Sequence, residues 1–480
     1  MTRWIMLALI VLVTSPLAAQ RGRRCSLEVL NVDREGVQQE PFQGYVNYYG
    51  GGNVRLGCVG QDVRLGGDSL ISLNSDIIFL FKNARYSDGT IRMIADSLTY
   101  SKQAERIEAR GAVTVTNIRT GSTITGPHLD YLRAVVGMRD SSEVYALERP
   151  TVRYLPTRAQ ADTSAAEPYV IVADRLRGLG SSFLWGGGAV TIDRGSLAGT
   201  ADSMFYRTGT INDLELIGIA TRAVVRDTAG DSLRVEGRQV VLGLASEEVR
   251  RVRANGEGEV RSGGSHVRAD SIAIVLDSGK VSTTSAWDRS AGAVVRSGGY
   301  DIGGDSVWIS SPGERLSEIR VFGDGIIRSP FDSTATDSAA VLPAPDGLST
   351  DSTTTDSATA SASDDRERDT LWGERIVAQF HDVDSAGTTI SRLQQITAIG
   401  TAASLFSRQV ERDGTSSPSI TYTRADTIVI LMRTDDTTGV LEVRARRGAQ
   451  PVDGVQLERA SLRRPARPAP TGGARREDGP

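Results

Sequence analysis

Two short patterns recur along this chain of 480 residues, and they constrain its fold more than any other feature. One is a small residue followed by Asp and Ser, as in Ala95-Asp96-Ser97. The other is a run in which apolar and polar residues alternate around a central small residue, as in residues 107–115. Alternation with a period of two is typical of a β-strand with one buried face. Self-similarity at about 20 to 50 residues indicates stacked repeats, none of which can bury its apolar face alone.

The central position of the alternating run recurs at steps of 29 to 40 residues over most of the chain. The last two steps, 67 and 77 residues, are about double the others, so we expect a worn or interrupted copy inside each. The sequence therefore predicts an all-β fold, built from tandem two-strand repeats joined by tight turns. The central positions are Gly52, Lys82, Gly111, Glu148, Gly188, Gly218, Gly256, Gly323 and Gly400.

One parity of each run is apolar, and we expect these side chains to face the interior of the fold. With small residues at the centre, stacked repeats would line a trough wide enough for acyl chains, whose burial yields ~25 cal/mol per Å² without specific hydrogen bonds. The alternative is that two sheets close tightly and this face is ordinary core. The residues predicted to face lipid are Ile107, Ala109, Gly111, Val113, Val115, Gly188, Val190, Val252, Gly256, Val260, Ile319, Val321, Gly323 and Ile327.

The repeated Asp allows two interpretations. Asp96 has the parity of the apolar Leu98 and Tyr100, which places it at a corner of the chain where its carboxylate caps backbone amides. The other interpretation is a row of carboxylates that binds calcium. Calcium-binding repeats place several Asp residues close together, whereas each repeat here offers one, so the sequence favours the structural corner.

The N-terminus predicts export. Residues 1–20 have a positive start at Arg3, an apolar core over residues 4–13 and a small-residue cleavage site at residues 17–19, as in a secretory signal peptide. Export leads to an oxidising compartment, where the two cysteines of the chain, Cys25 and Cys58, are expected to form a disulfide. The alternative is two free thiols.

Composition divides the rest of the chain into four parts. Residues 21–330 carry the larger repeat array, and residues 371–445 return to strand signals. Between them, residues 331–370 are rich in Ser, Thr, Ala and Asp, with a net charge of −7, and a segment this polar predicts disorder. Residues 446–480 form a basic, proline-rich tail that we also expect to be disordered.

The sequence offers no pattern for catalysis or for nucleic-acid binding. Net charge is −4, without the basic stripe that nucleic acid requires. The three histidines, His128, His266 and His381, have no metal-ligand spacing, and no nucleophile elbow or phosphate-binding loop is present. We therefore predict a protein that is not an enzyme and that needs no cofactor or metal.

The pairing of the ADSLTY motif at residues 95–100 with the following strand at residues 107–115, in tandem behind a signal peptide, resembles the OstA-like (organic solvent tolerance) domain family. This domain occurs in periplasmic lipopolysaccharide-transport proteins of the LptA type and in the N-terminal part of LptD. The clearest matches are residues 95–115, 172–192, 199–224 and 267–271. In that family the repeats form an elongated β-jellyroll, or β-taco, that is open along one seam and holds acyl chains inside.

The resemblance implies a periplasmic protein, or one associated with the outer membrane, that shields lipopolysaccharide acyl chains during transport to the outer membrane. Its implied partners are lipopolysaccharide or another acylated lipid, and other OstA-like domains that pair with it end to end. Two other classes of protein fit parts of the sequence. One is a structural or adhesive β-solenoid with a packed core and no lipid ligand. The other is a carbohydrate-active enzyme on a β-helix, which would require clustered carboxylates.

Overall fold

The computed structural model describes most of the two repeat arrays. The expectations for residues 1–20, 331–368 and 458–480 lie outside the described residues. The described residues are 25–40, 44–155, 167–208, 212–227, 231–245, 248–297, 299–329, 369–385, 388–412, 415–432, 440–448 and 450–457.

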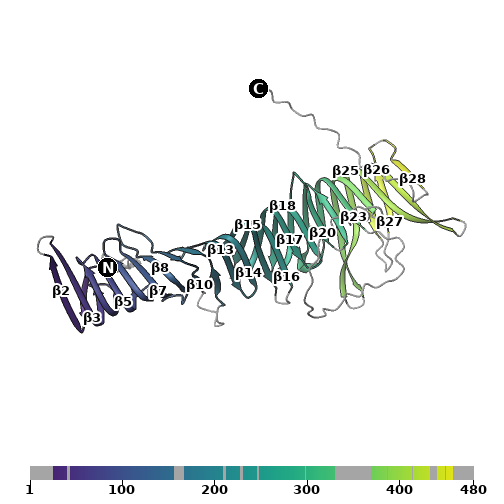
Figure 1. Ribbon diagram of the computed structural model, residues 1–480. Coiled ribbons are helices and arrows are strands. Elements are labelled where there is room, and N and C mark those ends of the chain that lie inside the picture. Colours follow the sequence, from purple (N-terminus) through teal and green to yellow (C-terminus); the bar gives the residue numbers. More distant parts are fainter. Residues whose placement is uncertain are drawn as a thin grey trace, which may run out of the picture. The chain divides into compact units, whose positions relative to one another are not determined.

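The all-β prediction is confirmed. The described residues form 28 strands, and their one helical element is the single-turn η1 (Pro312–Glu314). The chain divides into two units. Unit 1 contains residues 1–226 and 238–249, and unit 2 contains residues 227–237 and 250–480. Each unit is an antiparallel β-jellyroll built from tandem bent strands (Figure 1).

Strands β1 to β15 belong to unit 1, and the pairings between them are antiparallel. The division between the units falls within β16 (Ser232–Ala245) and β17 (Glu248–Ser262). The strands of unit 1 are β1 (Leu27–Asn31), β2 (Arg34–Glu40), β3 (Tyr45–Cys58), β4 (Arg64–Leu73), β5 (Ile77–Ser87), β6 (Ile91–Ser101), β7 (Arg106–Asn117), β8 (Thr123–Leu132), β9 (Glu143–Leu147), β10 (Thr151–Tyr154), β11 (Tyr169–Val172), β12 (Arg175–Leu179), β13 (Phe183–Arg194), β14 (Leu197–Arg207) and β15 (Asn212–Arg226).

Unit 2 repeats the same antiparallel pairing from most of β17 onward. Residues 371–445, predicted to return to strands, contribute β24 to β27, and the 17-residue β24 begins slightly earlier, at Asp369. Residues 453–457, expected to belong to the disordered tail, instead form β28, because they pair with β26. The further strands of unit 2 are β18 (Ser265–Asp277), β19 (Lys280–Trp287), β20 (Ala293–Ser297), β21 (Tyr300–Gly304), β22 (Ser306–Ser310), β23 (Glu318–Ser329), β24 (Asp369–Ser385), β25 (Thr388–Arg412), β26 (Thr415–Met432), β27 (Val440–Arg446) and β28 (Asp453–Leu457).

Most long strands bend in the middle, because two residues of one strand lie opposite one residue of its neighbour. In the β7–β8 pair, Arg110 faces His128 and Val113 faces Gly126, so residues 111–112 share one partner, Pro127. Residues 188–189 of β13 likewise lie opposite residue 202 of β14. Such a β-bulge bends the strand and increases its twist. The bend, which we call the corner, directs the two halves of each strand into two different half-sheets.

The two half-sheets of unit 1 are named A and B. Strands β9 and β10 act as two halves of one bent strand, as do β11 and β12, because each pair flanks a corner. Half-sheet A contains β2, β9, β12 and residues 47–51, 69–73, 77–81, 97–101, 106–110, 128–132, 183–187, 203–207 and 213–217. Half-sheet B contains β1, β10, β11 and residues 54–57, 64–67, 84–87, 91–94, 113–117, 123–126, 190–194, 197–200 and 222–225.

The central positions of the sequence repeat are the corners. At most of them φ is positive, with values of 94° at Gly111 and 69° at Gly323, a region in which glycine suffers no Cβ clash. This conformation explains why glycine recurs there. It also corrects the prediction that these glycines face the interior, since the four predicted positions Gly111, Gly188, Gly256 and Gly323 occupy bulges and not inward sites.

Most of the corner glycines lie against an acidic side chain of the preceding bent strand. A Cβ added to Gly111 would overlap the Asp96 carboxylate, which accepts a hydrogen bond of 3.1 Å from the Ala112 amide. Asp202 accepts an equivalent bond of 3.0 Å from the Ile219 amide. The corner interpretation of the repeated Asp is therefore confirmed, although the corner lies in the middle of a strand and not at its start.

The bulge also changes the parity that the sequence predicts for the Asp. Along β6, Ala95 is 3% exposed and Leu98 is 1% exposed, while Asp96 between them is exposed. Inward positions are therefore three residues apart at this corner and two residues apart elsewhere. Asp96 is thus out of phase with Leu98 and Tyr100, because strict alternation does not continue through a bulge.

The two long repeat steps have different explanations. Between Gly256 and Gly323, the predicted interrupted copy is present: β19 and β20 both pair with β18, and residues 288–292 form the corner between them as a loop. Between Gly323 and Gly400, no second bent strand is added, because β24 pairs with both β23 and β25. That step is long because it includes residues 330–368, so the expected extra copy was wrong there.

We predict that Gly323→Ala lowers the free energy of unfolding by at least ~2 kcal/mol, because alanine is strained at positive φ and its Cβ would overlap Asp305. Gly263→Ala is the matched control, with φ of 52° and open space around the added methyl group. It should cost only about 1 kcal/mol. Urea denaturation followed by tryptophan fluorescence measures both. Equal losses for the two variants would show that the Asp305 contact has no energetic role.

Candidate functional site

Apart from the corner glycines, the predicted lipid-facing residues of β7 and β13 lie in the interior of unit 1. Half-sheet A contributes Ile107 and Ala109, both 0% exposed, and half-sheet B contributes Val113 at 2%, Val115 at 3% and Val190 at 1%. These side chains are covered by protein atoms. The apolar parity predicted from the sequence therefore points inward, and it packs as a core in this structure.

The predicted residues of unit 2 are buried in the same way. Ile319 and Val321 precede the corner of β23 and Ile327 follows it, and none is more than 2% exposed. In β17, Val252 is 1% exposed and Val260 is 4% exposed. The sequence suggested that small central residues leave the interior open. In the structure, however, neighbouring side chains cover these buried residues closely.

Inward glycines show how closely the interior is packed. A Cβ on Gly325 would lie 2.9 Å from the Gly373 carbonyl oxygen, and one on Gly199 would lie 2.9 Å from Leu216 Cδ1. Real Cβ atoms do not approach other atoms so closely, so neither position has room for a methyl group without movement of its neighbours. Acyl chains could enter only if the half-sheets separate.

The edge opposite the corners, which we call the seam, is the place where such separation could occur. Within the described residues of unit 1, the backbone passes between half-sheets A and B only at corners. The hairpin turns at the seam join strands of the same half-sheet. Across the seam, the half-sheets are therefore connected by side chains and by the contacts of the N-terminal segment.

A pair of tyrosines forms the first cross-seam contact. Tyr131 of half-sheet A donates a 2.7 Å hydrogen bond to Asp88 Oδ2, in the turn that follows half-sheet B residue Tyr86. Tyr86 donates to the same oxygen at 3.1 Å, and the two rings lie 5.9 Å apart. Burial, together with the Asp88 carboxylate, raises the pKa of both phenols well above their usual range, so both remain donors.

A second aromatic cluster lies across the seam farther along unit 1. Tyr206 of half-sheet A contacts Tyr154 and Tyr169 of half-sheet B, with ring centroids 5.3 and 6.3 Å apart. Arg194 Nη1 donates a 2.6 Å hydrogen bond to the Tyr169 hydroxyl. Aromatic pairs in such geometry contribute ~0.5–1.5 kcal/mol beyond their buried area, so the cluster stabilises the closed seam.

A buried ion pair on the half-sheet A side of the seam makes two further cross-seam hydrogen bonds, and we call this group of contacts the latch. Glu105, in the β6–β7 turn of half-sheet A, is 0% exposed and pairs with Arg133 at 3.0 Å. Glu105 Oε1 accepts a 2.6 Å hydrogen bond from the Cys25 amide, which belongs to the half-sheet B edge. Arg133 also crosses the seam, through a 2.8 Å hydrogen bond from Nη1 to Gln61 Oε1.

The disulfide positions one side of the latch. Cys25 and Cys58 are bonded, and both residues are 2% exposed. Since Cys58 ends β3, the bond holds Cys25 on half-sheet B with its amide directed at Glu105. A 33-residue loop closed by a disulfide contributes ~3–4 kcal/mol in the chain-entropy view, so the latch rests on a stable anchor.

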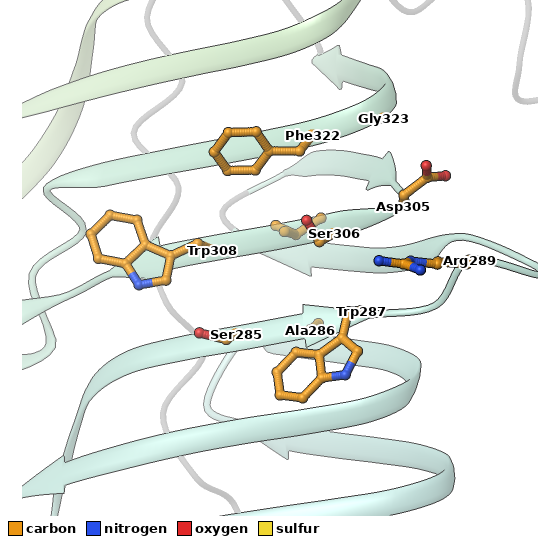
Figure 2. Close-up of a pocket in the computed structure, with 10 residues that line it drawn as sticks. Ser285, Ala286, Trp287, Arg289, Asp305, Ser306, Trp308, Phe322 and Gly323 are labelled. Carbon is orange, nitrogen blue, oxygen red and sulfur yellow. The ribbon is translucent and has the colours of Figure 1, made fainter.

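Unit 2 has a surface pocket of about 490 Å³ on the outer side of its strands. Figure 2 shows three aromatic rings, Trp287, Trp308 and Phe322, arranged around Ser306, with the Arg289 guanidinium to one side. They come from β19, β22 and β23, which are neighbours in the sheet. Arg320, which pairs with Glu318 at 2.8 Å, lies 4.7 Å from the Trp308 ring centroid, within the range of a cation–π contact.

The described residues show neither a metal site nor a membrane-spanning helix. No group of three His, Cys, Asp or Glu side chains comes together as possible metal ligands in this part of the chain. None of the described helices is long and apolar enough to cross a membrane. His128, distant from the other histidines in sequence, lies between three acidic side chains at 3.6 to 4.0 Å.

Sequence reasoning missed the residues that close the seam. Glu105 and Arg133 lie in turns 28 residues apart, and Tyr131 and Asp88 are 43 residues apart. One signal was available, because Glu105 lies only five residues after Tyr100, which donates a 2.9 Å hydrogen bond to it. The aromatic residues of the pocket in unit 2 were missed because they fall on the outward parity.

We predict that Glu105→Gln lowers the free energy of unfolding of unit 1 by ~3 kcal/mol, because the buried Arg133 guanidinium loses its counter-charge. Glu143→Gln is the control. The side chain of its partner Arg177 is 46% exposed to solvent, so the loss should stay within ~1 kcal/mol. Thermal and urea unfolding measure both variants. A loss for Glu105→Gln no larger than that of the control would refute the latch.

The raised tyrosine pKa values predict a pH dependence. In the unfolded chain, tyrosine loses its proton near pH ~10, whereas folded Tyr131 keeps it to higher pH. Tyrosines of this kind therefore contribute stability that is complete below pH ~10 and is lost as pH rises toward their folded pKa. The loss of stability between pH ~8 and pH ~11 should be smaller in Tyr131→Phe than in the unmodified protein.

The control for this experiment is Tyr45→Phe, which removes an exposed phenol from β3. Its urea midpoint should depend on pH as that of the unmodified protein does. Identical pH profiles for all three proteins would show that the buried Tyr131 phenol is not linked to stability.

Comparison with known proteins identifies no family for this chain. A scan against family models finds no match, and no curated protein matches it. The likeness to the OstA-like family therefore rests on the sequence motifs. What that likeness implies for function remains a proposal, which the geometry of the interior and the seam can support or oppose.

Proposed function

We propose that this protein is a periplasmic lipid carrier whose half-sheets separate at the seam to take up acyl chains between them. The proposed ligand is lipopolysaccharide or another acylated lipid, shielded during its transport to the outer membrane. No covalent step is involved. The residues that would contact the acyl chains are the inward apolar ones of β7, β13, β17 and β23.

One observation carries this proposal: the backbone joins the half-sheets of unit 1 at corners, while the described seam is closed by side chains. The corners can act as a hinge, and the seam contacts can break without any change in strand pairing. Separation would expose two apolar faces at once, and acyl chains would replace the lost burial at ~25 cal/mol per Å².

The packed interior favours a second candidate, a structural β-protein without a lipid ligand. Ile107, Ala109 and Val321 are all 0% exposed, as expected for a finished core. In that case the seam would never open under native conditions. The two candidates differ in whether a lipid reaches the inward side chains.

Edge strands support the proposed end-to-end pairing with other domains of this kind. Within the described residues, β2 pairs only with β3, so its other edge carries backbone groups that can accept a further strand. In unit 2, β28 pairs only with β26 among the described strands. A neighbouring domain could add its own edge strand at either place.

Photo-crosslinking at neighbouring inward and outward positions tests the lipid proposal. Benzoylphenylalanine at the inward Val113 or Val321 should crosslink to lipopolysaccharide or lipid A. The same probe at Thr114 or Arg320, the outward neighbours, should not. The inward probe replaces a small core side chain, so circular dichroism must first show that each variant is folded.

Crosslinking to protein neighbours shows that the inward probe is active in each preparation. With an active probe, the absence of lipid adducts at both inward positions would favour the packed structural protein. Equal adducts at inward and outward positions would place lipid on the surface and contradict an interior site.

A further inference from the structure

A pocket of about 580 Å³ lies on half-sheet B of unit 1, on the side facing away from the interior. Four arginines line it: Arg55 of β3, Arg64 of β4, Arg85 of β5 and Arg92 of β6. All four are exposed outward neighbours of buried residues such as Leu65 and Met93. The pocket therefore belongs to the outer face, and it is separate from the proposed lipid interior.

The strand register arranges these arginines as a checkerboard. Gly66 lies directly between Arg55 and Arg85 on neighbouring strands. Ser87 lies between Arg64 and Arg92 in the next row. Neighbouring strands are ~4.8 Å apart and alternate residues of one strand are ~6.8 Å apart, so the guanidinium groups can reach a common anion.

Two positions for an anion follow from this arrangement. Around Gly66, which has no side chain, Arg55, Arg64 and Arg85 line the pocket. Above Ser87, the surrounding residues are Arg64, Arg85 and Arg92, and the serine hydroxyl offers a further donor. Arg64 and Arg85 belong to both triads, so the two positions are adjacent.

The arginines lack acidic partners among the described residues. Arg64 Nη1 donates to the backbone oxygens of Gln61 and Val63, at 3.1 and 2.9 Å. The carboxylate that lines the pocket belongs to Asp68, which accepts a 3.0 Å hydrogen bond from Asn83 at the corner. By contrast, Arg106 and Arg110 of half-sheet A pair with Asp130 and Glu108 at 2.9 and 2.7 Å.

We propose that this pocket is a binding site for a ligand with two or more phosphate groups. Guanidinium groups bind phosphate oxygens bidentately, and they do so better than ammonium groups. A ligand anion would also relieve the mutual repulsion of four neighbouring cations. This proposal does not depend on lipid entering the interior, because the four arginines of the pocket lie on the outer face.

The phosphate groups could belong to a small soluble polyanion or to the headgroups of a lipid surface. Two probes distinguish these sources. Isothermal titration calorimetry with inorganic tripolyphosphate tests for a soluble ligand. A flotation assay tests for a lipid surface, using phosphatidylcholine vesicles with and without phosphatidylglycerol. Binding to either probe should weaken steeply with added salt, as ion-pair binding does.

Arg85→Gln is the informative variant, because Arg85 belongs to both triads. The affinity of this variant for the bound probe should fall at least ~10-fold. The affinity of Arg55→Gln should fall by a smaller factor, because Arg55 belongs to only one triad. Arg153→Gln is the matched control, since Arg153 is an outward arginine of half-sheet B outside the pocket. It removes the same charge and should leave the affinity within ~2-fold of the unmodified protein.

Each outcome decides something. Binding of tripolyphosphate that is lost in Arg85→Gln supports a soluble ligand, and binding restricted to phosphatidylglycerol vesicles with the same loss supports a headgroup. The proposal is overturned if the unmodified protein binds neither probe, or if Arg153→Gln loses as much affinity as Arg85→Gln.

Discussion

The contact between an acidic side chain and the corner of the next bent strand is the interaction on which the rest of this structure depends. The Asp96 carboxylate bonds the Ala112 amide, and Asp202 does the same for Ile219. A bulge leaves backbone amides without ladder partners, and an acceptor in this place compensates for that loss. We infer that this acidic acceptor keeps the bends at matching positions in successive strands.

Aligned corners have consequences for the whole of each unit. Because the strands bend at matching positions, their halves form two half-sheets with facing apolar sides, and the interior lies between them. The backbone crossings collect on one side, which leaves the seam to side-chain contacts such as Tyr131 with Asp88 and Glu105 with Cys25. In our proposal, this fold is fixed along the edge of the corners and opens along the seam.

The sequence predicted the repeat better than it predicted the geometry. The central positions at Gly111, Gly188 and Gly323 do mark structural repeats, and the apolar residues beside them do point inward. Period-two alternation identifies strands, but it does not reveal a bulge, so the same glycines were wrongly expected to face inward and Asp96 was wrongly put in phase with Leu98. Only the register shows that two residues lie opposite one.

The sites outside the repeat depend on register and on distant contacts. Glu105 and Arg133 meet because two turns lie side by side at the seam, and neither turn has a recurring pattern. Arg55, Arg64, Arg85 and Arg92 are ordinary outward residues in the sequence, and only strand pairing brings them around Gly66 and Ser87. Local sequence preferences carry no information about contacts between residues that are distant in the chain, so the sequence alone does not predict these two sites.

The distance across the seam tests the central claim that the corners are fixed while the seam opens for lipid. Spin labels at Thr90 and Lys102 would report it, since these turns belong to half-sheets B and A. A second pair at Thr90 and Arg119 would report a distance within half-sheet B. We predict that adding lipopolysaccharide lengthens the first distance, measured by double electron–electron resonance, and leaves the second unchanged. An unchanged first distance with bound lipid, or a change in both distances, would contradict the account.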